Sequence, residues 1–316
     1  MTLQNVCLVG ANGTLGTAIT KALVSSSSSS TFTISILRRQ TSASPPAPAG
    51  VTEIPVSPSL TLAELTTALQ GQHAVIAAFP LTDVTQHLRL VQAAHDAGVS
   101  RYIPADYGSC DAASPRPQQY LQLYRDKTAV RARCEELAAA SPGACFSWTS
   151  IICGHFFDHG LEDGLLHFDL AEQTALILDT GRVRASTSTL SRVADAVVRV
   201  LQHPDQAATR NRALYIQSFC PSQLEILAAL ERATGRTWKT QHVDSADFLE
   251  TASTRLAEGN KAAVEDIVFV LGTVDADWRG RDGFAMELLG LEDEDLDAVV
   301  ARVVREHEGG KKKQEA

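Results

Sequence analysis

The chain has 316 residues, of which 44% are hydrophobic and 21% charged, a composition typical of globular proteins. Its length predicts two domains or one large α/β domain with an added lobe. The formal net charge of -9 disfavours nucleic acid and anionic membranes as partners, because both bind concentrated positive charge. No apolar run approaches the roughly 20 residues of a membrane span, so we expect a cytoplasmic protein without membrane contact.

Strand and helix patterns alternate along the first half of the chain, which predicts a parallel sheet with crossover helices. The serines at 25–30 and the proline-rich segment 40–50 predict connecting loops. The fold class is therefore α/β, with a Rossmann-type doubly wound parallel sheet and a smaller α/β substrate-binding lobe. The expected strands are 6–9, 32–37, 74–79, 102–105 and 145–152, and the clearest expected helices are 83–97 and 118–140.

The alternation becomes irregular after about residue 153, which sets the predicted domain boundary. We expect residues 1–153 to form a nucleotide-binding domain, to which a later part, about 176–217, returns. Residues 154–306 should form mainly the second lobe, with 240–306 mostly helical. The polar residues 307–316 predict a flexible tail.

A glycine-rich turn lies between the first predicted strand and the first predicted helix. Gly10, Gly13 and Gly16 follow the spacing G-x-x-G-x-x-G. In this context Gly10 permits a tight turn, Gly13 allows close approach of a pyrophosphate, and Gly16 lets the helix pack near the strand. The motif favours a dinucleotide site over a purely structural turn.

The end of the second strand indicates which dinucleotide is bound. An acidic residue there holds the ribose hydroxyls of NAD, whereas arginine accommodates the 2′-phosphate of NADP. The strand ends in Arg38 and Arg39 with no acid, which favours NADP(H) because guanidinium groups pair well with phosphate. A solvated basic pair is the alternative.

Two further segments make a family resemblance specific. Together with the glycine loop and the arginine pair, Ile103-Pro-Ala-Asp-Tyr-Gly108 and Asp126-Lys-Thr-Ala-Val-Arg131 resemble the isoflavone reductase and phenylcoumaran benzylic ether reductase group of NmrA-like proteins, which are atypical short-chain dehydrogenases. The similarity runs from residue 3 to roughly 250. It implies an NADP(H)-binding Rossmann domain and a smaller lobe for the substrate. The cofactor residues expected on this basis are Gly10, Asn12, Gly13, Thr14, Leu15, Gly16, Arg38, Arg39, Phe79 and Lys127.

The resemblance also implies a catalytic role for one lysine. The family places an active-site lysine at the position of Lys127, and Arg131 follows it by one helical turn as a structural companion. An ammonium group there acts as a general acid or polarises a substrate oxygen. The usual Tyr-x-x-x-Lys pair is absent, because Leu123 stands four residues before Lys127. Without the resemblance, a surface lysine on an ordinary helix face would be the favoured interpretation.

Residues 153–167, rich in histidine and phenylalanine, follow the strand after the lysine helix, and in the resembled family this segment lines the substrate pocket. His155 and His159 have the i,i+4 spacing of a metal site, but the glutamate of H-E-x-x-H is missing and the six cysteines form no C-x-x-C pair, so we expect no metal. We favour His155 as a pocket hydrogen-bonding or acid/base group, with ordinary structural histidines as the alternative. The predicted pocket residues are Asp106, Tyr107, His155, Phe156, Phe157 and His159.

Three functions are consistent with this set of residues. The first is an NADPH-dependent reductase of an apolar aromatic or polycyclic secondary metabolite, in which Lys127 is the acid or polarises the oxygen. The second is a redox-neutral isomerase or rearrangement enzyme that uses the same cofactor site. The third is an NADP(H)-sensing regulator like some NmrA relatives, which Lys127 argues against because a sensor does not need it. We expect a small-molecule substrate and a monomer or homodimer.

Overall fold

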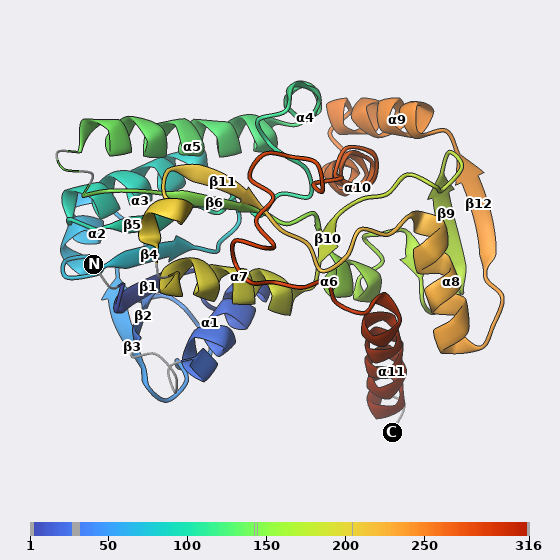
Figure 1. The fold of residues 1–316 in the computed structure, drawn as a ribbon, viewed down its shortest axis with the longest axis horizontal. Coiled ribbons are helices and arrows are strands. Elements are labelled where there is room, and N and C mark those ends of the chain that lie inside the picture. The colour runs from blue at the N-terminus through green and yellow to red at the C-terminus, as the bar shows by residue number, and fades with distance from the viewer. Residues whose placement is uncertain (1–2, 27–31, 142, 144, 204, 315–316) are drawn as a thin grey trace. The chain divides into compact units, whose positions relative to one another are not determined.

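The computed structural model describes residues 3–26, 32–141, 143, 145–203 and 205–314, and divides into two compact units (Figure 1). Unit 1 comprises residues 1–107, 122–151 and 193–214, and unit 2 comprises 108–121, 152–192 and 215–316. Residues 27–30 of the predicted serine loop lie outside the described residues, and the loop expected at Ser25 and Ser26 is wrong, because these two residues end the first helix. The functional roles expected for the two parts of the chain stay predictions.

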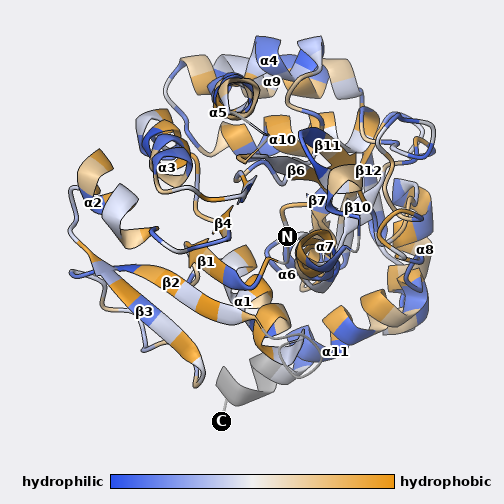
Figure 2. Ribbon diagram, turned by 60° about the vertical axis from the view of Figure 1, so that its left-hand side comes forward, coloured by the Kyte–Doolittle hydropathy of each residue, from blue (hydrophilic) through white to orange (hydrophobic). Residues whose placement is uncertain are grey.

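Unit 1 is built on a five-stranded parallel sheet, which confirms the predicted fold class. The sheet has the order β3-β2-β1-β4-β5. In Figure 2 the residues of β1 and β4 are mainly hydrophobic, as expected for strands covered on both faces. The strands are β1 (Asn5–Val9), β2 (Thr33–Arg39), β3 (Val51–Val56), β4 (Ala74–Ala77) and β5 (Arg101–Ile103).

Helices cover both faces of this sheet (Figure 1). Helix α1 (Thr14–Ser26) lies on one face, and α2 (Leu62–Ala68), α3 (Val84–Asp96) and α5 (Gln122–Ala140) lie on the other. Side-chain caps begin two of them, because Thr61 accepts from the Glu64 amide and Asp83 from the Thr85 amide. The core between the sheet and helices α2, α3 and α5 is apolar and includes Val75, Leu90 and Val130.

A buried arginine fixes the late segment of unit 1 to the sheet. The guanidinium of Arg101, on β5, donates to the hydroxyls of Ser147, Thr149 and Thr209 at 2.9–3.0 Å and to the Gln206 carbonyl at 3.1 Å. Burial lowers the pKa of Arg101 to about 10, so the group stays charged at neutral pH. These neutral acceptors tie residues 206–209 to the edge of the sheet.

The structure differs from the expected elements at several points. The strand expected over 145–152 begins only at Thr149. The single helix expected over 118–140 is wrong: α4 (Pro115–Tyr120) ends before Leu121, whose extended φ of −128° and ψ of 133° separate it from α5. Leu121 is buried, so tertiary packing overrides the helical pattern at this point. Strand β3 was not predicted, because it is an edge strand that carries Pro55 and exposed polar residues.

Unit 2 combines short strands with helices. Its largest sheet has the order β12-β9-β8, and its apolar core joins α6, α8 and α11 to β9. Helix α8 begins with a capping box of Ser222 and Glu225 and ends at Gly235 with φ +65°. The elements are β7 (His155–Phe156), α6 (Phe157–Glu162), β8 (Phe168–Asp169), β9 (Thr174–Leu178), β10 (Thr187–Ser188), α8 (Gln223–Thr234), β12 (Lys239–Val243), α9 (Ser245–Ala257), α10 (Ala263–Val274) and α11 (Leu296–Gln314).

Three elements span the division between the units: β6 (Thr149–Ile152), α7 (Leu190–Gln202) and β11 (Arg212–Tyr215). Strands β6 and β11 pair with each other. The mostly helical character expected for 240–306 is only partly correct, because 275–295 contains no regular helix. Helix α11 continues to Gln314, and the flexibility expected for 307–316 stays a prediction.

Candidate functional site

The glycine loop has the geometry of a site for an anionic ligand. Gly10 has φ +93°, and a Cβ there would lie 2.6 Å from the Ala78 carbonyl oxygen. A Cβ on Gly16 would lie 2.0 Å from the Gly10 oxygen, so helix α1 can pack here only with glycine. A Cβ on Gly13 would have no neighbour closer than 3.5 Å. Gly10 and Gly16 are therefore required by the fold, whereas the exposed Gly13 leaves the helix N-terminus open to a ligand.

The other loop residues divide by exposure. Asn12 and Thr14 are exposed at the start of α1. The Leu15 side chain is buried, so only its backbone amide is suited to bind a ligand. These placements are compatible with the predicted cofactor roles, which stay predictions.

Three strand ends meet beside this loop. Gly10 follows β1, Phe79 follows β4 and Asp106 follows β5, and all three strands are parallel. The order reverses between β1 and β4, since β2 and β3 extend the sheet on one side and β5 on the other. In open α/β sheets, ligands bind outside the carboxyl ends of the strands at this reversal. The predicted cofactor and catalytic residues of unit 1 are therefore gathered at one edge.

The arginine pair at the end of β2 has two different environments. Arg38 Nη1 lies 2.8 Å from Glu53 Oε1 and donates to the Pro45 carbonyl at 2.7 Å. Arg39 is exposed, and among the described residues its side chain makes no hydrogen bond or ion pair that the structure records. Arg38 thus organises the loop after β2, and Arg39 is the guanidinium available to an anion.

Lys127 lies on α5 next to the loop that follows β5. Its Nζ donates a hydrogen bond to the Asp106 carbonyl oxygen. The Asp106 carboxylate, 2% exposed, forms an ion pair with Arg131, whose Nε lies 3.2 Å from Oδ2. Helix α5 brings Lys127 and Arg131 to one face because they are four residues apart. The expected association of Lys127, Asp106 and Arg131 is present, and Tyr107 follows in a strained backbone conformation with φ +20°.

His87 lines the same small cavity as Asp106 and Lys127, although no sequence motif points to it. It lies on the first turns of α3 and is 1% exposed. Its ring stacks on Phe79 with a centroid separation of 3.8 Å and an interplanar angle of 16°. Its Nε2 lies 3.2 Å from the Pro80 carbonyl oxygen, so Nε2 carries the proton and Nδ1 holds a lone pair. A histidine on an apolar helix face looks like a core residue until its neighbours are known.

Burial of His87 predicts acid sensitivity. Burial lowers its pKa from 6.5 to about 4, opposed by the Pro80 carbonyl and by Asp83 and reinforced by Lys127. As pH falls below about 6.5, the unfolded chain binds a proton that the folded chain does not, so stability is lost until about pH 4. The free energy of unfolding should fall by about 1 kcal/mol per pH unit from this group. Denaturant unfolding of the wild type and His87→Gln between pH 7 and 5 measures it, and an equal pH slope in the two would contradict the assignment.

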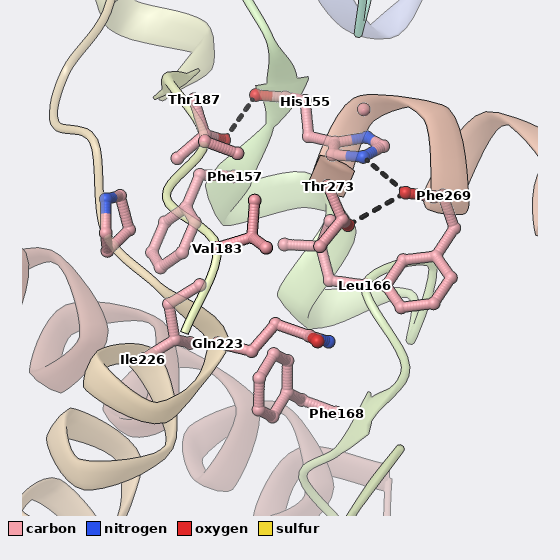
Figure 3. A pocket seen from close by; sticks show the side chains of 13 residues that line it. His155, Phe157, Leu166, Phe168, Val183, Thr187, Gln223, Ile226, Phe269 and Thr273 are labelled. Carbon is pink, nitrogen blue, oxygen red and sulfur yellow. Dashed lines mark hydrogen bonds between the residues drawn. The ribbon is translucent and has the colours of Figure 1, made fainter. Parts of the chain in front are cut away.

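A second candidate site is an apolar pocket within unit 2 (Figure 3). His155 lies at its edge, with Nε2 3.3 Å from the Phe269 carbonyl oxygen, which also accepts from Thr273 at 2.8 Å. A Cβ on Gly272 would lie 2.3 Å from His155 Nε2, so this glycine lets the ring approach α10. The pocket has a volume of about 30 Å³. Other lining residues include Phe157, Leu166, Phe168, Val183, Gln223 and Ile226.

The predicted pocket residues of this segment separate in the structure. His155 and Phe157 line the pocket, whereas Phe156 and His159 are not among its lining residues. His159 faces Asp163 at 3.3 Å, one turn along the chain. Burial lowers the pKa of His155 to about 4, which favours a neutral hydrogen-bonding group over an imidazolium at neutral pH. The pocket residues of α10 were missed because that helix lies far along the chain and carries no motif.

Neither a metal cluster nor a membrane helix is found in the part of the chain that the structure describes. No group of three or more His, Cys, Asp or Glu side chains there could hold a metal ion. Within the same ranges, no helix combines the length and apolar character needed to cross a membrane.

Two known proteins are similar to this chain over almost its whole length. Oxidoreductase poxI of Penicillium oxalicum is 32% identical over 304 residues, covering 93% of this chain and 92% of that protein. Oxidoreductase aprR of Aspergillus flavus is 30% identical over 308 residues, covering 96% and 100%.

Solved structures extend the comparison to the fold alone, since their sequences are distant. A crystal structure of isoflavone reductase superposes with a TM-score of 0.74 and 19% identity, covering 95% of this chain and 99% of that one. The leucoanthocyanidin reductase–NADPH complex from Vitis vinifera gives a TM-score of 0.72 and 16% identity, with the same coverage. The NmrA-like family model matches residues 2–306, nearly the whole chain, and the chain therefore belongs to the NmrA-like family.

Proposed function

We propose that this protein is an NADPH-dependent reductase. The observation that carries the proposal is that unit 1 contains three suitable features. They are the uncrowded glycine loop, the exposed Arg39 and the Lys127 ammonium that the Asp106 carbonyl fixes. Two curated relatives that cover almost the whole chain are named oxidoreductases, and two similar structures were solved with NADP⁺ or NADPH. The retained Lys127 favours an enzyme over a sensor.

The residues of unit 1 fit the cofactor. The amides at the start of α1 and the uncrowded Gly13 suit a pyrophosphate, and Arg39 suits a 2′-phosphate. Phe79, whose ring stacks on His87, offers an apolar surface beside the glycine loop. When bound, NADPH supplies a hydride to an electrophilic carbon of the substrate.

Lys127 supplies the protein's part of the chemistry. Its ammonium keeps two N–H donors beyond the one directed at Asp106, since a lysine has three. We infer that one of these hydrogen-bonds to the substrate oxygen and stabilises the charge that develops there, or transfers its proton. The backbone carbonyl of Asp106 fixes the ammonium, and the ion pair with Arg131 fixes the Asp106 loop.

We further propose that the substrate is an apolar aromatic or polycyclic secondary metabolite. The support is the pocket of unit 2, whose walls are mainly aromatic and aliphatic, with His155 and Gln223 as polar groups. Because its volume is only about 30 Å³, this pocket would take an apolar substituent of such a substrate, and the rings themselves would lie outside it. Similar solved structures include one with NADP⁺ and (+)-pinoresinol and one of a triphenylmethane reductase from Citrobacter.

The preference for NADPH over NADH tests the proposed cofactor. Arg39→Ala should weaken NADPH binding about ten- to a hundredfold, because it removes a charge-assisted contact, and should change NADH binding little. Arg38→Ala should also weaken NADPH more than NADH, but by less, because Glu53 already neutralises that guanidinium. Titration calorimetry with both cofactors measures these constants, and equal affinity of the unmodified protein for NADPH and NADH would refute the proposal.

A further inference from the structure

A small, partly open cavity in unit 1 is lined by Lys127. Its volume is about 10 Å³, which is about the space that one water molecule requires. Leu81, Pro104, Ala105 and Val130 form its apolar walls, and His87, Asp106 and Lys127 are its polar lining. An apolar cavity of this size would remain dry, but one with three polar side chains can hold water.

Two polar atoms of this lining lack a hydrogen-bond partner in the part of the chain that is described. They are His87 Nδ1 and Asp106 Oδ1, and both are buried. Each is an acceptor: Nδ1 because Nε2–H donates to Pro80, and Oδ1 because the carboxylate is paired with Arg131 through Oδ2. A buried acceptor without a partner costs free energy, so two of them on one cavity point to an occupant.

The third polar group is a donor. Lys127 Nζ uses one N–H for the Asp106 carbonyl and has others available. An occupant must therefore donate twice, to His87 and Asp106, and accept once, from Lys127. A cation is excluded by the ammonium, and an anion is excluded by the carboxylate and the imidazole lone pair. Water has two hydrogens and two lone pairs, which match this set.

We propose that the cavity binds one water molecule that donates to His87 Nδ1 and Asp106 Oδ1 and accepts from Lys127 Nζ. His87 is then a positioning residue: through this water it restrains the Lys127 ammonium, which the Asp106 carbonyl also holds by a direct hydrogen bond. The water site rests on these contacts alone, and its effect on turnover rests on the proposed function.

Two amide substitutions of His87 separate this role from ordinary packing. His87→Asn places an amide oxygen near the position of Nδ1, keeping the acceptor and losing the bond to Pro80. His87→Gln reaches the position of Nε2, keeping the bond to Pro80 and losing the acceptor. Both lose the stacking on Phe79, so that loss cancels in the comparison. If His87 is purely structural, glutamine should preserve activity better than asparagine. If His87 binds the water, asparagine should preserve activity better.

Crystal structures of the three proteins, at a resolution that places ordered waters, test the site without any assay. We expect a water within hydrogen-bond distance of all three groups in the wild type and in His87→Asn, and none in His87→Gln. An empty cavity in the wild type overturns the water site. A water retained in His87→Gln overturns the assignment of His87 as its ligand.

Steady-state kinetics test whether His87 positions Lys127. His87→Gln should lower kcat on the order of tenfold or more, since a misplacement of about 1 Å in a catalytic group can cost about a hundredfold. His87→Asn should stay within a few-fold of the wild type, and KM for NADPH should change equally in both. Equal kcat in the two variants, with the water present as described, overturns the positioning role. If the protein reduces no substrate at all, the proposed function fails, while the crystallographic result still decides the water site.

Discussion

Arg131→Met should lower the free energy of unfolding by about 3–5 kcal/mol, the usual result of removing one partner of a buried ion pair. The Asp106 side chain is 2% exposed and that of Arg131 10%, so water cannot replace the lost guanidinium. Methionine keeps much of the stem and the helix propensity, which confines the change to the charge and its hydrogen bonds. Denaturant unfolding followed by circular dichroism measures the difference.

Two further variants make this result specific. Arg133→Met removes a guanidinium from the same helix, but its 2.7 Å pair with Glu136 is exposed, so we expect a loss of about 1 kcal/mol or less. Asp106→Asn, added to Arg131→Met, removes the stranded charge and should recover part of the stability. Equal losses for Arg131→Met and Arg133→Met would mean that the buried pair has no special role.

The sequence predicted the fold of unit 1 because its signals are local. Apolar runs mark β1 and β4, Thr61 and Asp83 begin helices with their own side chains, and the glycine loop lies where a strand becomes a helix. The break at Leu121 was not predictable in this way, because it depends on the burial of that residue by distant parts of the chain.

The candidate site shows the same limit. Lys127, Asp106 and Arg131 were found because they lie in two short motifs of a known family. His87 was missed because its importance comes from Phe79 and Pro80, on the turn after β4, and from the small cavity, and only the folded chain brings these to α3. Gly272 was missed for a similar reason, since only the folded chain brings it against His155.

Lys127→Met should lower turnover by on the order of a hundredfold or more, the usual contribution of a general acid. The ammonium acts on charge that develops in the transition state, so NADPH affinity should change much less. The methionine stem preserves the packing on α5, and the buried pair of Asp106 and Arg131 remains in place, so the fold should persist. Lys127→Arg is the matched variant: it keeps the charge but not the compact ammonium, and should recover activity only in part.

The test offers C4-deuterated NADPH and a panel of aromatic ketones, enones and benzylic ethers to the protein and detects deuterium transfer by mass spectrometry. This finds a substrate and then measures the effect of Lys127→Met on its turnover. Label in the product with one NADPH consumed per turnover supports reduction. Product formed without net consumption of NADPH, or with NADP⁺ alone, would instead support redox-neutral rearrangement at the same site. Unchanged turnover in Lys127→Met, with NADPH binding intact, would make the lysine structural, and the mechanism proposed for its ammonium would be wrong.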